Sequence, residues 1–164
     1  MPLAYIALGS NLGDRMGQMR RALGLLSEGG EVRVLRTSPV YQNRAVGMGA
    51  EADDFLNAVA EIDSALDPLG LLDLCLRVER QLGRARSMDG WKPRTIDLDI
   101  LFYEGASMND GRLVLPHPRI AERDFVAVPL AELAPELEVD GRSAGEIVRD
   151  LSKNELTLYS ENLQ

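Results

Sequence analysis

The sequence predicts a two-layer α+β sandwich of the ferredoxin-like type, with a βαββαβ core and additions at its C-terminal end. Short stretches rich in strand formers alternate with stretches whose apolar residues recur every three or four positions. Their order is strand, helix, strand, strand, helix, strand, which suits one sheet covered by two helices. With 164 residues, 45% of them apolar and 27% charged, the chain suits a single globular domain over residues 1–164.

The first half of the core is punctuated by turn-forming residues. Residues 3–8 predict a strand that stops at the turn formers 9–14. Residues 16–26 carry apolar side chains at helical spacing, and two glycines follow shortly afterwards as a helix stop. Residues 32–41 and 55–62 predict the second and third strands.

The second half of the core begins with a clear helix start. Asp67 is a good N-cap, and Pro68 suits the first helical position of a helix that runs to Gly83. Residues 95–103 form the clearest strand of the sequence. Residues 42–54 predict a long loop, a kind of segment that is often functional in a small domain.

The additions after the core carry weaker patterns. Residues 120–123 and 128–133 predict two short helical segments, and Pro135 stops the second. The polar segment after about residue 153 is expected to be a loosely held tail.

Composition excludes several classes of function. A formal net charge of −8 and a pI near 4.7 argue against nucleic acid as a partner, because phosphate backbones need basic neutralisation. No apolar run approaches the roughly 20 residues that span a bilayer, so no membrane association is expected. The single cysteine, Cys75, suits a reducing compartment, and we expect a cytoplasmic monomer.

Two aspartates in the clearest strand are the strongest chemical signal. Asp97 and Asp99 are two residues apart, so they project from the same face of a strand. Aspartate is depleted in strands, and neighbouring carboxylates repel each other unless a cation lies between them. Magnesium with substrate phosphates meets that need, whereas a solvent-facing pair on an edge strand is the plainer interpretation. The alternate residues are expected to face the core: Ile96, Leu98, Ile100 and Phe102.

A basic segment precedes the aspartates. Residues 84–94 hold four basic side chains and one acid in a chain that is acidic overall. Guanidinium groups suit phosphate oxygens, and a basic loop beside a two-carboxylate site is what phosphoryl transfer requires. An ordinary solvated loop is the alternative.

Other phosphate and metal motifs are missing from the sequence. It holds neither a Walker P-loop sequence nor the protein-kinase motifs. His117 is the only histidine, which rules out a histidine-rich metal site. It lies between two prolines, where a histidine is more often a plain loop residue than a catalyst, and a phosphate or ribose contact is the other possibility.

Together these segments resemble the 6-hydroxymethyl-7,8-dihydropterin pyrophosphokinase family. The resemblance covers about residues 4–135 and is carried by AYIALGSNLG at 4–13, FLNA at 55–58, RVERQLGR at 77–84, PRTIDLDIL at 93–101 after Trp91, and LPHP at 115–118. The RTIDLDIL stretch is highly specific, whereas the GSNLG turn is only supportive. The resemblance implies a ferredoxin-like fold, a role in making folate, and attack by the pterin's hydroxymethyl oxygen on the β-phosphorus of ATP, which leaves AMP.

The resemblance also implies residue roles. Asp97 and Asp99 would hold two Mg²⁺ ions, and Arg84 and Arg94 would complete the catalytic set. The implied pterin-binding residues are Asn43, Val46, Phe55, Asn57, Trp91, Asp97 and Phe125, with Phe55 and Phe125 stacking on the ring. The implied ATP-binding residues are Leu72, Glu79, Arg84, Arg86, Trp91, Arg94, Ile100, Arg112, His117 and Arg123.

The sequence departs from the family's pattern at three places. A basic residue usual in the family is replaced by Gly90, while Lys92 stands where a small residue is common. The loop at 42–47 lacks a common proline, and Pro118 replaces another residue. Two alternatives to an active enzyme follow: a related protein that binds ATP or pterin without turnover, and an unrelated ferredoxin-like binding module.

Overall fold

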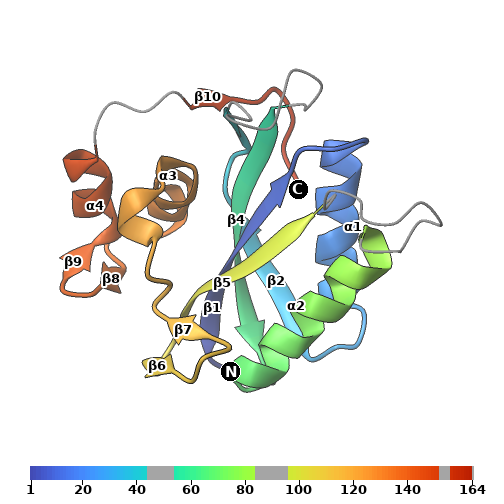
Figure 1. The fold of residues 1–164 in the computed structure, drawn as a ribbon, viewed down its shortest axis with the longest axis horizontal. Helices are drawn as coiled ribbons and strands as arrows, with labels where there is room; N and C mark the ends of the chain where they lie inside the picture. Colours follow the sequence, from blue (N-terminus) through green and yellow to red (C-terminus); the bar gives the residue numbers. More distant parts are fainter. Residues whose placement is uncertain (44–53, 84–95, 152–155, 164) are drawn as a thin grey trace.

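A computed structural model describes residues 1–43, 54–83, 96–151 and 156–163. Within these ranges the chain forms a six-stranded antiparallel sheet in the order β10-β3-β4-β1-β5, with β2 paired to the other end of β4. The strands are β1 (Leu3–Ser10), β2 (Val32–Thr37), β3 (Tyr41–Asn43), β4 (Phe55–Ser64), β5 (Asp97–Tyr103) and β10 (Thr157–Leu158). The core elements follow in the order β1-α1-β2-β3-β4-α2-β5, in which β2 and β3 replace one predicted strand, and the predicted ferredoxin-like α+β class is confirmed (Figure 1).

Helices α1 (Arg15–Ser27) and α2 (Pro68–Leu82) lie side by side on one face of the sheet (Figure 1). Asp67 caps α2 as predicted, because its side chain accepts the Gly70 N–H, and Asp14 caps α1 in the same way by accepting the Gly17 N–H. The main apolar core lies between these helices and the sheet, and includes Ile6, Leu8, Met19, Leu26, Ile62, Leu71 and Leu98.

The opposite face carries a smaller helical unit (Figure 1). It consists of a 3₁₀ turn at Ile120–Glu122, helix α3 (Asp124–Leu133) and helix α4 (Ala144–Asp150). A second apolar cluster joins this unit to the sheet through Val59, Leu101 and Leu130. Two small hairpins flank it: β6 (Met108–Asn109) with β7 (Val114–Leu115), and β8 (Glu138–Val139) with β9 (Arg142–Ser143).

The predicted strand 32–41 is wrong as a single element. It is divided into β2 and β3 by residues 38–40, where Pro39 cannot donate a ladder hydrogen bond. Ser38 fills the gap, because its N–H donates to the Val59 carbonyl at 2.8 Å and its Oγ accepts the Val59 N–H at 2.9 Å. The two pieces therefore pair with different halves of β4.

The predicted orientation of Phe102 is also wrong. Ile96, Leu98 and Ile100 do face the main core, but the register between β1 and β5 shifts after the Ile6–Ile100 pair. Tyr5 then pairs with Phe102, which packs on the α3 side of the sheet. A bulge at Leu101 therefore exchanges the two faces of β5.

The C-terminal additions differ in extent from their weak sequence patterns. The pattern at 128–133 belongs to α3, which already begins at Asp124 and contains Pro129. Residues 157–158, in the segment expected to be loosely held, pair with β3, and Leu163 is buried in the main core. No helix in the described ranges combines the length and the apolar character needed to cross a membrane.

Candidate active site

A row of four directly paired residues crosses the sheet at the end where β1 stops. Gly9 pairs with Asn57 on one side and with Asp97 on the other, and Asn57 pairs in turn with Tyr41. Directly paired residues project from the same face, so Asn57 and Asp97 lie on the α3 side, two strand spacings or about 10 Å apart. We call Tyr41, Asn57, Gly9 and Asp97 the polar row.

Gly9 leaves the middle of the polar row open. A Cβ atom at this position would lie 3.2 Å from Oδ1 of Asn57, which is tighter than an ordinary contact. The sequence signal for Gly9 is the GSNLG turn at residues 9–13, which is supportive and not specific. The missing side chain makes a shallow floor between an amide and a carboxylate.

The second carboxylate lies one step along the same face. Asp99 pairs with Ala7, which pairs with Val59. Asp97 is half-buried and Asp99 is exposed, and Leu98 between them is buried in the main core. The predicted common face of the two aspartates is therefore confirmed.

The amide side of the polar row is held by β3. The Asn57 side chain donates from Nδ2 to Oδ1 of Asn43, the last residue of β3. Asn43 pairs with Phe55, the half-buried first residue of β4. Three predicted pterin-binding residues thus lie together: Asn43, Phe55 and Asn57.

Helix α3 brings two more predicted residues to the same face. Phe125 is half-buried in the first turn of α3 and packs against the second apolar cluster. Arg123, the N-cap residue, places its guanidinium carbon 5.8 Å from the centre of the Phe125 ring. This cation–π contact orients both side chains before any ligand binds.

The other side of β5 faces α2 and holds a second group of predicted residues. Glu79 is buried on α2, and its Oε2 accepts the N–H of Leu98 at 2.8 Å, so it fixes the strand between the two aspartates. Leu72 is half-buried on the same helix. Ile100 is in the main core, on the face of β5 opposite to Asp99.

Cys75 lies near these carboxylates but is chemically inert. Burial, followed by the negative charges of Glu79 and Asp99, raises the pKa of its thiol to about 12. The thiol therefore stays protonated at neutral pH and is not a candidate nucleophile.

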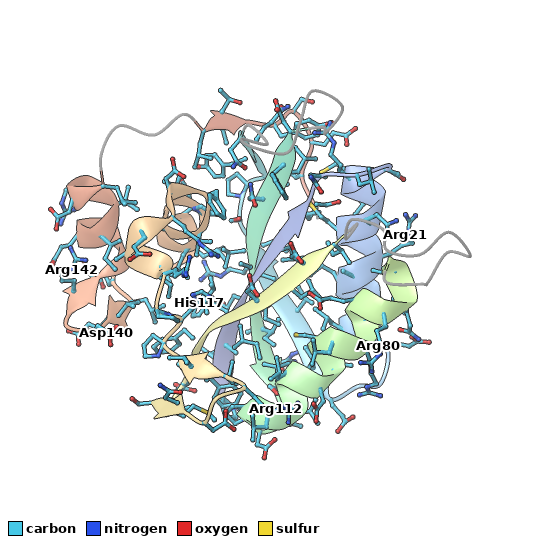
Figure 2. All side chains as sticks on the ribbon, viewed as in Figure 1. Arg21, Arg80, Arg112, His117, Asp140 and Arg142 are labelled. Atoms are coloured by element: carbon cyan, nitrogen blue, oxygen red, sulfur yellow. The ribbon has the colours of Figure 1, made fainter. Side chains whose placement is uncertain are left out.

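His117 lies beside β5, on the segment between β7 and the 3₁₀ turn (Figure 2). The backbone N–H of His117 donates to the Leu101 carbonyl at 2.8 Å. Its ring Nδ1 accepts the backbone N–H of Arg119 at 3.1 Å. Burial lowers the pKa of His117, although the negative charge of Asp99 opposes that shift. The ring is therefore neutral at pH 7, with its proton on Nε2.

Arg112 is placed away from the polar row, next to the start of α2 (Figure 2). Its Nη2 donates to Oδ1 of Asp73 at 2.6 Å, and both side chains are about half exposed. The remaining predicted site residues lie outside the described residues: Val46, Arg84, Arg86, Trp91 and Arg94.

The donor set suits a hard cation that is only partly held by protein. In the described part of the chain no three histidine, cysteine or acidic side chains converge on one metal position. Mg²⁺ is usually held by one or two carboxylates together with waters and substrate phosphates. Asp97 and Asp99 fit that arrangement, and a phosphate-bearing substrate would supply the other ligands.

The chain is thus an α+β protein whose sheet brings two carboxylates, two amides and an aromatic side chain to one face. A family described as 7,8-dihydro-6-hydroxymethylpterin-pyrophosphokinase (HPPK) matches residues 5–135.

The names of individual relatives match that family. A 2-amino-4-hydroxy-6-hydroxymethyldihydropteridine pyrophosphokinase of Methylorubrum extorquens is 45% identical over 151 residues, which cover 92% of this chain and 94% of the relative. One of Bacillus subtilis is 44% identical over 142 residues, 87% of this chain and 84% of the relative. The chain therefore belongs to the 7,8-dihydro-6-hydroxymethylpterin-pyrophosphokinase family, and the resemblance drawn from the sequence is confirmed.

A solved structure agrees with the fold. A Plasmodium falciparum HPPK-DHPS triple mutant with SDX-DHP superposes with a TM-score of 0.67 at 13% identity, over 90% of this chain. This chain spans 44% of that one. At this identity the similarity speaks for the fold alone.

Proposed function

We propose that this chain transfers the pyrophosphoryl group of ATP to the hydroxymethyl oxygen of 6-hydroxymethyl-7,8-dihydropterin and releases AMP. Its family carries out pyrophosphate transfer in folate biosynthesis, and its relatives match over nearly their whole length. The observation that carries the proposal is the pair Asp97 and Asp99 on an accessible sheet face, next to an amide floor.

Asp97 and Asp99 are the proposed magnesium ligands, and we propose two ions. When bound, Mg²⁺ would neutralise phosphate charge and lower the pKa of the pterin hydroxyl. Glu79 keeps the backbone between the aspartates in place through the Leu98 N–H. The two carboxylates are thereby held at a fixed spacing before substrate arrives.

The pterin pocket is proposed over the amide side of the polar row. Asn57 would read the polar edge of the ring, with its amide orientation fixed by Asn43. Phe55 and Phe125 are half-buried aromatic rings on β4 and α3, and they would stack on the ring from two sides. Val46 and Trp91 would complete the pocket.

ATP is proposed to lie along the edge of β5, between the carboxylates and α2. In that position Nε2–H of the neutral His117 can donate to a phosphate or sugar oxygen. Arg123 would contact phosphate from the start of α3, and Leu72 and Ile100 belong to the apolar side of this region. Arg84, Arg86, Arg94 and Arg112 are the proposed guanidinium partners, with Arg84 and Arg94 stabilising the transferred group.

No general base is assigned. Asp97 and Asp99 are proposed metal ligands, burial lowers the pKa of His117, and burial together with the bond to Glu132 raises the pKa of Tyr41 to about 12. Catalysis would then consist of positioning and charge stabilisation, as in other phosphoryl transfers.

The test is AMP release from ATP and Mg²⁺ in the presence and absence of 6-hydroxymethyl-7,8-dihydropterin. Pterin-dependent AMP formation is expected. ADP as the nucleotide product would indicate a simple phosphotransferase, and absence of turnover despite tight binding of both ligands would indicate a binding protein.

A further inference from the structure

A second row of paired residues crosses the same sheet face, away from the polar row. It consists of Arg36, Glu61, Tyr5 and Phe102 on β2, β4, β1 and β5, and we call it the anchor row. Glu61 is four residues from Asn57 along β4, so the two rows are about 13 Å apart. The anchor row therefore does not touch the proposed substrates.

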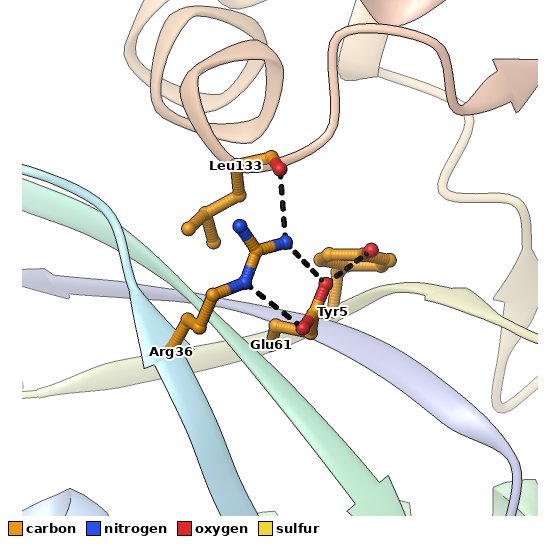
Figure 3. Close-up of polar contacts among 4 residues, drawn as sticks. All are labelled: Tyr5, Arg36, Glu61 and Leu133. Carbon is orange, nitrogen blue, oxygen red and sulfur yellow. Dashed lines mark hydrogen bonds and ion pairs between the residues drawn. The ribbon is translucent and has the colours of Figure 1, made fainter.

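The anchor row contains a completed ionic network (Figure 3). Arg36 donates to Glu61 from Nε at 3.1 Å and from Nη2 at 2.8 Å, and the Tyr5 hydroxyl donates to Glu61 Oε2 at 2.6 Å. Arg36 holds the pKa of Glu61 below its usual range through these bonds, so the buried carboxylate is charged at neutral pH. Burial and the bond to Glu61 raise the pKa of Tyr5.

A bulge in β2 directs Arg36 into this network. The register between β2 and β4 shifts between Val34 and Arg36, so that Arg36 instead of Leu35 lies opposite Glu61. Bulges commonly re-aim one side chain of a strand. Here the bulge selects the residue that faces α3.

Arg36 also forms a hydrogen bond to the end of α3. Its Nη2 also donates to the carbonyl of Leu133, the last residue of the helix, at 3.0 Å (Figure 3). A helix ends with carbonyls that lack intrahelical partners, and a cation at this end also interacts favourably with the helix dipole. The Tyr41 hydroxyl donates to Glu132 Oε1 at 3.0 Å and gives the same end of α3 a second polar tie.

The other end of α3 carries the proposed substrate contacts. Phe125 is eight residues before Leu133, about 12 Å along a helix, and Arg123 provides no side-chain hydrogen bond as N-cap among the described contacts. Apolar packing under α3 is non-directional, whereas the two polar ties fix where the helix lies along the sheet.

We propose that Arg36, clamped by Glu61 and Tyr5, is a positioning residue that holds α3 in register, so that Phe125 covers the pterin pocket. This inference rests on the proposed function, because it needs Phe125 to stack on the pterin. The inference gives Arg36, which lies outside the motifs that carry the family resemblance, an effect on pterin affinity.

The chain offers a matched control on the same strand pair. Arg33 donates to Oδ2 of Asp63 at 3.1 Å from Nε and 2.6 Å from Nη2, again from β2 to a buried carboxylate on β4. No described contact joins Arg33 to α3. Arg33→Gln and Arg36→Gln therefore remove the same charge from two ion pairs that join the same strands, and among the described contacts only Arg36→Gln removes a bond to the helix.

The experiment measures the Kd of 6-hydroxymethylpterin by its fluorescence, with Mg²⁺ and α,β-methylene ATP present. The proteins are the wild type, Arg36→Gln, Arg33→Gln, Phe125→Ala and the double variant Arg36→Gln/Phe125→Ala. We expect Arg36→Gln to raise the Kd about 10-fold, since small misplacements of a binding group are costly, and Arg33→Gln to change it less than about twofold. In the Phe125→Ala background, Arg36→Gln should add less than about twofold, because the two residues act through one contact.

Two results would overturn the inference alone: equal effects of Arg36→Gln and Arg33→Gln, or a full additional effect of Arg36→Gln in the Phe125→Ala background. An unchanged Kd for Phe125→Ala would overturn the proposed pterin pocket and the inference with it. If Arg36→Gln fails to fold by circular dichroism, Tyr41→Phe replaces it, since it removes only the tie to Glu132. We expect Tyr41→Phe to raise the Kd about threefold, and no change would contradict the inference.

Discussion

The two faces of the sheet are built from the same strands but do different work. The face under α1 and α2 takes the alternate apolar residues of β1, β4 and β5, and it is closed. The face toward α3 is apolar where α3 packs on it, and it presents Asn57, Gly9, Asp97 and Asp99 at the end where β1 stops. Stability thus depends mainly on one face, and the proposed chemistry on the uncovered part of the other.

A single strand, β5, contributes both to the main core and to the proposed site. In β5, Leu98 is buried in the main core while its neighbours Asp97 and Asp99 point to the open face. Substitutions at adjacent positions of β5 should therefore separate effects on turnover from effects on stability.

The largest effect is expected for the carboxylates. Asp97→Ala and Asp99→Ala should each lower kcat by about 10³-fold or more, because each removes a proposed metal ligand. Their thermal unfolding should stay close to that of the wild type, since neither side chain belongs to the core. Near-normal turnover in either variant would refute the two-carboxylate site.

The residue between them should behave in the opposite way. Leu98→Ala should lower the free energy of unfolding by about 2–5 kcal/mol, because it leaves a cavity in the main core. Measured in urea below the unfolding transition, its kcat should fall far less than that of Asp97→Ala. Comparable kcat losses in the two variants would remove the distinction between the faces.

A smaller effect is expected at the floor of the site. Gly9→Ala places a methyl group 3.2 Å from Asn57 Oδ1 and should raise the KM for the pterin by about 10-fold, because it disturbs the bond to Asn43. Gly24→Ala is the control, since nothing lies near its Cβ position on α1. The control should leave KM unchanged and raise stability slightly. Equal KM values for the two variants would refute the role of the open floor.

The smallest effect concerns pH. Since Arg36 lowers the pKa of folded Glu61, its contribution to stability is complete above the ordinary glutamate pKa near 4.5 and is lost as pH falls through the lower, folded value. Glu61→Gln should therefore flatten the fall in unfolding free energy below pH 4.5, by at most about 1.4 kcal/mol per pH unit. Chemical denaturation at several acidic pH values measures this slope, and an unchanged slope would refute the assignment.

Most of the structure on the face under α1 and α2 can be predicted from the sequence, because the spacing of apolar residues indicates which side chains are buried. The cap at Asp67 and the alternation of Ile96, Leu98 and Ile100 both carry local signals. The division of strand 32–41 and the orientation of Phe102 carry no local signal, since they depend on pairing partners elsewhere in the chain.

The site shows the same limit. Asp97 and Asp99 are recognisable from one strand, because two aspartates at strand spacing contradict strand propensity. The place of Gly9 between Asn57 and Asp97 requires three strands in register, and the tie from Arg36 to α3 requires a bulge and a distant helix. Such features arise from tertiary structure, and no local sequence pattern predicts them.

We propose that Asp97 and Asp99 on the open face bind nucleotide through magnesium. Titration of α,β-methylene ATP into the wild type, Asp97→Asn and Asp99→Asn by calorimetry, with and without Mg²⁺, tests it directly. We expect Mg²⁺ to strengthen binding to the wild type by at least about 10-fold, and we expect both variants to lose this dependence. Binding to the wild type that is equally tight without Mg²⁺, or a magnesium dependence that survives in both variants, would contradict it.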